Sequence, residues 1–251
     1  MRLISLSLSL VLAAAPAFAD STAPPAPSSE PGSVTEIRLG KAPSPPPPAD
    51  PARVRAVERF LAARRDASAA RAKGRHANLG LPAPKGAKAE ELYGPAESRL
   101  VAFDFQDASI EGAGAGRFTV SAYLLFADAT GQIVESRDEI LTFAGSGGSW
   151  ACTSLRTAAG MTWSSGPIQE TAAAIGAVEE LQKARTHLRD WTATREQALG
   201  YSLSDVQKEH DGRVLVPCIR FTAGSGRRGF EVDHRPVVLS RDQGGVRVES
   251  N

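Results

Sequence analysis

The sequence predicts an α+β protein of two tandem units, each a long helix packed on a four-stranded antiparallel meander. Two stretches with helical apolar periodicity begin near Pro51 and Pro167. Each is followed by short apolar segments separated by Gly-containing turns, a pattern typical of antiparallel strands. Residues 99–155 also align without a gap on residues 195–251. These observations together favour a repeated helix-plus-sheet unit.

Composition limits the classes of function. The chain has 251 residues, enough for one large or two small domains, and 42% of them are apolar. The formal net charge is +1 and aromatic residues make up 6%. This balance gives no reason to expect nucleic-acid binding or a surface for stacking bases.

The N-terminus has the pattern of a secretory signal peptide. Residues 1–19 combine a cation at Arg2, a short apolar core, and small residues at Ala17 and Ala19. The apolar run is short for a membrane span, although an uncleaved anchor is the alternative. We therefore expect cleavage after Ala19, a periplasmic or secreted protein, and no stable membrane insertion afterwards.

Residues 20–49 are rich in Pro and Ser and lack an apolar face. Such a composition cannot offset the entropy of ordering, which predicts a disordered, Pro-rich linker. A docking role toward an aromatic groove is the alternative to a simple tether.

The first helix is expected to begin at Asp50-Pro51, because Asp caps free N–H groups and Pro suits the first helical position. Gly74 is a plausible end. The apolar stripe consists of Val54, Val57, Phe60 and Leu61. Residues 75–98 resemble a loop with a short turn.

The first helix is also strongly basic. A cationic surface could bind an envelope protein, a lipid headgroup or an anionic envelope polymer, and a solvated face is the alternative. The residues predicted to bind a polyanion are Arg64, Arg65, Arg71, Lys73 and Arg75.

Four strands are expected after this loop. Alternation in 100–105 places Phe103 and Phe105 on the face opposite Asp104. The strand over 132–143 is expected to be partly exposed, because its middle is polar. Gly-rich segments such as AGSGGS precede strands, so they are interpreted as turns and not as phosphate-binding loops.

The second helix is expected from Pro167 to Trp191 as one continuous element after a linker at 156–166. A helix lying across a sheet explains its apolar stripe more simply than a coiled coil. The predicted units are therefore 50–155 and 167–251. One larger α+β domain with two packed sheets is the alternative.

The stretch VSAYLLFADATGQIVESRDEILTFAGSGGSWACTSL (120–155) resembles the C-terminal half of the nuclear-transport-factor-like, or SnoaL-like, family within the cystatin-like group. The resemblance rests on a strand, a D-x-x-G turn, a charged strand and a final strand opening on Gly-x-Trp. It implies a sheet wrapped around a helix, used in that family as an enzyme pocket or as a binding or dimerisation module. Fold alone does not choose between these uses.

Candidates for chemistry are few. The four histidines show no metal-ligand spacing, and no cofactor motif is present. Asp104 and His234 are weak catalytic candidates, with a solvent-facing carboxylate and an ordinary strand histidine as the alternatives. Cys152 and Cys218 could form a disulfide in an oxidising compartment, or remain two buried thiols.

These features favour an exported, non-enzymatic binding or protein-interaction module. The competing class is a small-molecule enzyme, a hydrolase or isomerase, that uses a cone-shaped pocket. A deep apolar pocket with Asp104 or His234 on its wall would favour the enzyme.

Overall fold

The computed structural model describes residues 50–106, 111–112, 116–225 and 228–249. The predicted signal peptide and Pro-rich linker lie outside these residues. The described chain is α+β, with antiparallel sheets and few helices, as the sequence predicts. No helix among the described residues is long and apolar enough to cross a membrane.

Helix α1 (Pro51–Ala72) follows the sequence prediction closely. Asp50 Oδ1 accepts a hydrogen bond from the Ala52 amide at 2.9 Å, and Gly74 has the left-handed φ of 67° that ends many helices. Val57, Phe60 and Leu61 are buried against the first sheet. Helix α2 (Ala89–Tyr93) is a short turn within the loop that follows.

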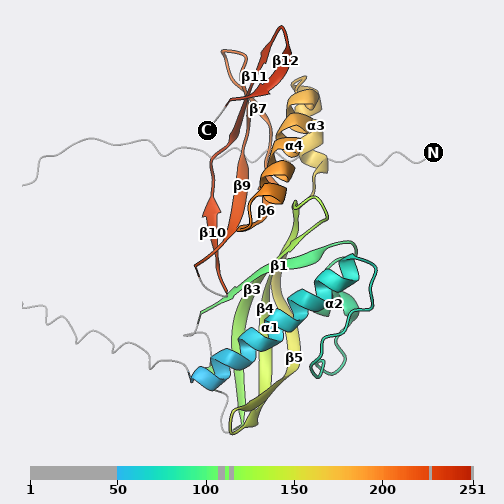
Figure 1. Cartoon of the computed structure of the whole chain (residues 1–251), viewed down its shortest axis with the longest axis vertical. Coiled ribbons are helices and arrows are strands. Elements are labelled where there is room, and N and C mark those ends of the chain that lie inside the picture. Colours follow the sequence, from blue (N-terminus) through green and yellow to red (C-terminus); the bar gives the residue numbers. More distant parts are fainter. Residues whose placement is uncertain (1–49, 107–110, 113–115, 226–227, 250–251) are drawn as a thin grey trace, which may run out of the picture. The chain divides into compact units, whose positions relative to one another are not determined.

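The first sheet has the strand order β1-β3-β4-β5, and α1 lies across it (Figure 1). All pairs are antiparallel, and the short strand β2 also pairs with β3. The strands are β1 (Arg99–Phe105), β2 (Glu111–Gly112), β3 (Arg117–Ala127), β4 (Ile133–Ser146) and β5 (Ser149–Thr162).

Strict alternation in the first strand is wrong because β1 contains an irregularity. The register of β1 against β3 shifts between Leu100 and Ala102. Leu100 therefore joins Phe103 and Phe105 in the α1-side core, while Ala102 packs in a different cluster.

The predicted linker at 156–166 is largely strand. β5 continues to Thr162, which pairs with Glu135 of β4. The polar middle of β4 is also more buried than expected, since Ser136, Arg137 and Glu139 are all buried. Ion pairs and hydrogen bonds, described below, make this burial tolerable.

The predicted second helix is divided into α3 (Gly166–Ala174) and α4 (Val178–Thr194). Gly176 has a φ of 70°, and the Ala177 amide donates to the Ala172 carbonyl at 2.7 Å. This is a helix-ending turn. Val178, which the periodicity placed on the buried stripe, is 46% exposed as a result.

The C-terminal strands form two small antiparallel sheets, ordered β10-β9-β6 and β12-β11-β8-β7. Pro217 separates β8 from β9, and Pro236 lies between β10 and β11. Proline has no N–H for a strand ladder. The strands are β6 (Ala198–Leu203), β7 (Gln207–Lys208), β8 (Val214–Val216), β9 (Cys218–Ala223), β10 (Phe230–Asp233), β11 (Val237–Asp242) and β12 (Gly245–Val248).

Three hydrophobic clusters form the described core. One lies between α1 and the first sheet, and a second lies between α3, α4 and the C-terminal strands. The third joins the two halves and includes Leu125, Ile133 and Phe221. The Gly229 amide also donates to the Phe103 carbonyl at 3.1 Å, so the β9–β10 loop is bonded to β1.

Candidate functional site

A groove of about 910 Å³ lies beside α1. One wall is the helix face from Ala52 to Arg65, and the opposite wall comes from β1 and from the C-terminal half. Its apolar lining includes Ala56, Val101, Phe103, Leu199 and Ala223. The volume is in the range that small-molecule sites occupy.

The groove is strongly cationic. Four arginines and one acidic residue, Glu58, line it. Arg55 and Arg59 are exposed, and Arg59 Nη2 is 3.4 Å from the Trp150 carbonyl. Arg65 is partly buried. Its guanidinium carbon is 5.9 Å from the ring centroid of the lining residue Phe103.

Arg228 completes the cationic rim from the C-terminal half. Its guanidinium carbon lies 4.1 Å from the Phe105 ring centroid, and its Nε is 3.8 Å from Glu58 Oε1. The ring and the carboxylate hold this arginine in place. The groove thus combines fixed positive charge with an apolar floor, which suits an anion attached to an apolar group.

Arg64 is not a surface cation, and the prediction that it binds a polyanion is wrong. Its side chain has 0% exposure and its Nη1 is 2.7 Å from Oε2 of the equally buried Glu139. Of the other predicted residues, Arg71 donates to the Gly94 carbonyl at 2.8 Å, while Lys73 and Arg75 are exposed. Only Arg65 of the predicted set lines the groove.

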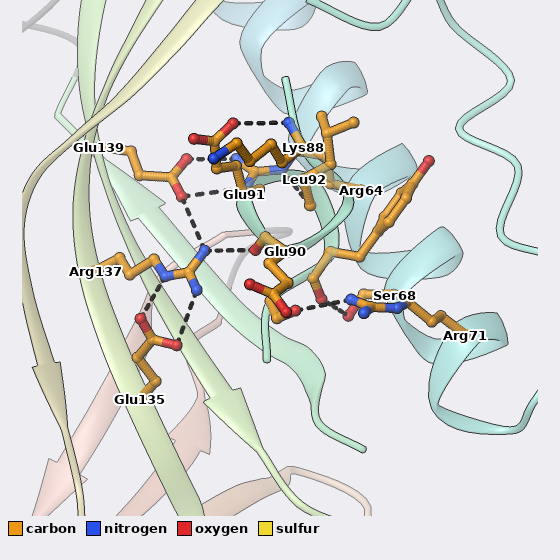
Figure 2. Close-up of polar contacts among 12 residues, drawn as sticks. Arg64, Ser68, Arg71, Lys88, Glu90, Glu91, Leu92, Glu135, Arg137 and Glu139 are labelled. Atoms are coloured by element: carbon orange, nitrogen blue, oxygen red, sulfur yellow. Dashed lines mark hydrogen bonds and ion pairs between the residues drawn. The ribbon is translucent and has the colours of Figure 1, made fainter. Parts of the chain in front are cut away.

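Arg64 instead helps to hold the α2 segment (residues 89–94), as Figure 2 shows. Its Nε donates to the Leu92 carbonyl at 2.9 Å and its Nη2 to the Glu91 carbonyl at 2.8 Å. Ser68 donates to the Tyr93 carbonyl at 2.7 Å. A short helix leaves its last carbonyls without intrahelical partners, and these side chains supply them.

Arg137 of β4 binds the same segment from the sheet side (Figure 2). Its Nη1 donates to the Glu90 carbonyl at 2.9 Å, and its Nε and Nη2 contact Glu135 at 2.6 and 2.9 Å. The α2 segment is therefore fastened to both α1 and β4 through its main chain.

A second cavity, of about 500 Å³, lies between α4 and strands β9, β10 and β12. Buried Arg220 on its wall donates to the Arg235 carbonyl at 2.8 Å and lies 3.8 Å from Asp233. The Arg235 guanidinium bonds Asp233 and holds the pKa of that carboxyl at about 2. Burial, reinforced by Arg220, lowers the pKa of His187.

The weak catalytic candidates lie outside both cavities. Asp104 is half-buried and its Oδ1 accepts from the Phe105 amide at 2.8 Å. His234 is exposed. Neither side chain lines the groove or the second cavity. Within the described ranges, no cluster of His, Cys, Asp and Glu could hold a metal ion.

The two cysteines are free, buried thiols. Of the two possibilities that the sequence left open, the structure therefore has the separate thiols and not the disulfide. Cys152 packs in the α1-side cluster and Cys218 in the α4-side cluster. Burial raises the pKa of Cys152 to about 12 and also raises that of Cys218. Neither is therefore a reactive thiolate.

Comparison with known proteins gives no relative: no family model, curated protein or solved structure matches this chain.

Proposed function

We propose that this chain is an exported, non-enzymatic binding protein whose site is the basic groove beside α1. Its ligand is an envelope molecule that joins an anionic group to an apolar part. Export rests on the signal-peptide pattern alone. The observation that carries the proposal is the placement of Arg55, Arg59, Arg65 and Arg228 around an apolar floor.

For the basic groove, a binding role is better supported than the competing enzyme. General acid–base chemistry needs a titratable group within hydrogen-bond reach of the substrate. Asp104 and His234 line neither cavity, and the one carboxylate in the groove, Glu58, faces Arg228. Fixed guanidinium groups bind anions well but do not accept protons at neutral pH.

We further propose that the chain consists of two tandem units, because the strand registers repeat. The pair Glu111↔Thr119 of β2 and β3 recurs 96 residues later as Gln207↔Leu215 of β7 and β8. The same shift relates β3–β4 to β8–β11 and to β9–β10, and it relates β4–β5 to β11–β12.

The first strands of the two units, β1 and β6, also correspond, but here the shift is 98 residues and not 96. The bulge in β1 falls beside the pair Ala102↔Leu125, and that in β6 falls beside Gly200↔Phe221. The continuous β3–β4 ribbon becomes two short sheets in the second unit, since prolines 217 and 236 take the places of a facing pair, Ser121↔Ile140.

We also propose that the units are nuclear-transport-factor-like. A nuclear-transport-factor-like unit implies a sheet wrapped around a helix. The packing of α1 against the first sheet and of α4 against β6 and β12 is consistent with that expectation.

The groove can be tested with dodecyl phosphate as the probe, below its micelle concentration, by titration calorimetry. Dodecanol and inorganic phosphate separate the apolar and anionic contributions. The double variant Arg55→Glu/Arg59→Glu should weaken binding by about tenfold or more, and added salt should weaken it further. Lys73→Glu/Arg75→Glu changes the same charge outside the groove and is the control. Equal losses in both double variants would show non-specific attraction and overturn the proposal.

A further inference from the structure

The second cavity occupies the place that the α2 segment fills in the first unit. Between helix and first strand, the first unit has residues 73–98, which include α2, while the second unit has only residues 195–197. This correspondence depends on the proposed tandem architecture and not on the function of the basic groove.

The two long helices can be matched by their buried positions. Val57, Leu61, Arg64 and Ser68 of α1 have the spacing of Ala177, Leu181, Ala184 and Leu188 beside and within α4. Arg71, which binds the Gly94 carbonyl, then corresponds in position to Trp191 of the second unit.

The sheet residues around α2 also have counterparts in the second cavity. Gly94 packs against Phe126, and Arg137 binds the Glu90 carbonyl. At the shift of 96 residues these positions are Thr222 and Asp233. All three counterparts line the second cavity, namely Trp191, Thr222 and Asp233.

The lining of the second cavity suits a peptide main chain. Arg195, Arg220 and Arg235 line it with guanidinium groups, and Glu231, Asp233 and Glu249 line it with carboxylates, of which Asp233 is bonded to Arg235. This balance of three cations and three anions differs from the cationic groove. Trp191 adds an apolar wall, and the Arg195 guanidinium carbon lies 6.0 Å from its ring centroid.

The chemistry of the first unit shows what such a site holds. There, arginine and serine side chains donate to the carbonyls of residues 90 to 94, and Leu92 is buried. In the second unit Arg64 and Ser68 are replaced by Ala184 and Leu188, so the donors are Arg220 of β9, Arg235 just after β10 and Arg195 at the end of α4 instead.

We propose that the second cavity is a docking site for a short peptide segment of a partner protein, bound through its main-chain carbonyls and one apolar side chain. The segment takes the place that α2 occupies in the first unit. A volume of about 500 Å³ is sufficient for a ligand of a few residues.

A phage-displayed library of random heptapeptides, selected on the full mature chain, tests this site. Enriched peptides should share a motif, and a synthetic peptide carrying it should bind in fluorescence anisotropy. Trp191→Ala should weaken its binding by about tenfold or more. Glu231→Lys, at an exposed position, should also weaken it, which guards against misfolding of the tryptophan variant. Arg55→Glu/Arg59→Glu should leave peptide binding unchanged, so that failure of this site and of the groove can be told apart.

Three results would overturn the proposal. The first is a selection in which peptides are enriched no more on the unaltered chain than on the Trp191→Ala protein. The second is a peptide that binds Trp191→Ala and Glu231→Lys as tightly as the unaltered chain, or whose binding is lost only in Arg55→Glu/Arg59→Glu. The third is dimerisation of the unaltered chain that Trp191→Ala abolishes, because the occupant would then be a second copy.

Discussion

Arg64 and Glu139 form an ion pair in which both side chains are inaccessible to solvent, with Nη1 2.7 Å from Oε2. The pair joins α1 to β4, and the remaining donors of Arg64 bind α2 carbonyls. Such a pair is tolerated in a core only when its hydrogen-bonding capacity is satisfied. Its role is therefore to fix helix, segment and sheet in one arrangement.

Removal of one partner should be strongly destabilising. We expect Arg64→Met to lower the free energy of unfolding by about 3–5 kcal/mol, because the buried Glu139 loses its closest cation and keeps only Arg137, whose Nη1 is 3.9 Å from Oε1. Denaturant unfolding measures the loss. Arg65→Met on the next, partly exposed position should cost under about 1 kcal/mol.

The double variant Arg64→Met/Glu139→Leu should recover part of the loss, since it removes the buried carboxylate together with its partner and leaves Arg137 paired with Glu135. If the double variant is instead less stable than Arg64→Met by the full cost of Glu139→Leu alone, the two losses simply add. That result would contradict this account of the pair.

Gly94 is required by the close packing of the α2 segment on Phe126. It has a φ of 87°, and a Cβ at this position would overlap the Phe126 ring. Gly94→Ala should therefore lower stability by about 2–3 kcal/mol through strain and overpacking. Gly86 has a φ of 79° with open space around it, so Gly86→Ala isolates the backbone contribution, about 1 kcal/mol. Equal losses in thermal unfolding would exclude overpacking at Phe126.

The sequence predicted the elements better than their irregularities. Capping by Asp50 and the apolar stripe of α1 follow from local rules, and both are confirmed. The break at Gly176 and the shift after Leu100 were missed, because glycine inside a helical pattern is tolerated and a bulge leaves no fixed mark in one strand.

One signal for the burial of Arg64 was available. Arg64 continues the spacing of Val57, Phe60 and Leu61, so it belongs to the buried stripe by position although its chemistry suggests a surface. What periodicity could not supply was its partner, since Glu139 lies 75 residues away on β4.

The candidate site was harder to predict for the same reason. Arg55 and Arg59 are one turn apart on a single helix face, but the groove also needs Phe103 and Arg228 from distant segments. Single-sequence patterns report neighbours along one element, and contacts between elements follow only once the strands are paired.

The signal peptide that residues 1–19 predict can be tested by expression. Expressed with its leader in a Gram-negative host, the chain should accumulate in the periplasm with Asp20 as its first residue, because Ala17 and Ala19 satisfy the small-residue rule for cleavage. Intact-mass measurement reads the new terminus. Ala19→Phe should retain the leader, and a leaderless chain should stay in the cytoplasm. An uncut wild-type chain in the membrane fraction would support the anchor alternative.

The buried thiol of Cys152 should make the fold sensitive to alkaline pH. Its pKa is raised by burial from 9.0 to about 12, so the unfolded thiol ionises first as the pH rises and the folded state is left with more bound protons. Stability from this group is therefore complete below pH 9 and is lost progressively above it, by about 1–2 kcal/mol near pH 10.5.

Denaturant unfolding between pH 8 and 10.5 isolates this effect when the unaltered chain is compared with Cys152→Ala, whose alkaline loss should be smaller by that amount. Cys218→Ala retains the Cys152 thiol, so the part of the alkaline loss of stability that comes from Cys152 should remain. Alkylation of the unfolded, unreduced chain should add two groups, because both thiols are free. A chain that takes up no alkyl group would contain the Cys152–Cys218 disulfide. Neither the expected loss of stability above pH 9 nor the argument from buried free thiols would then hold.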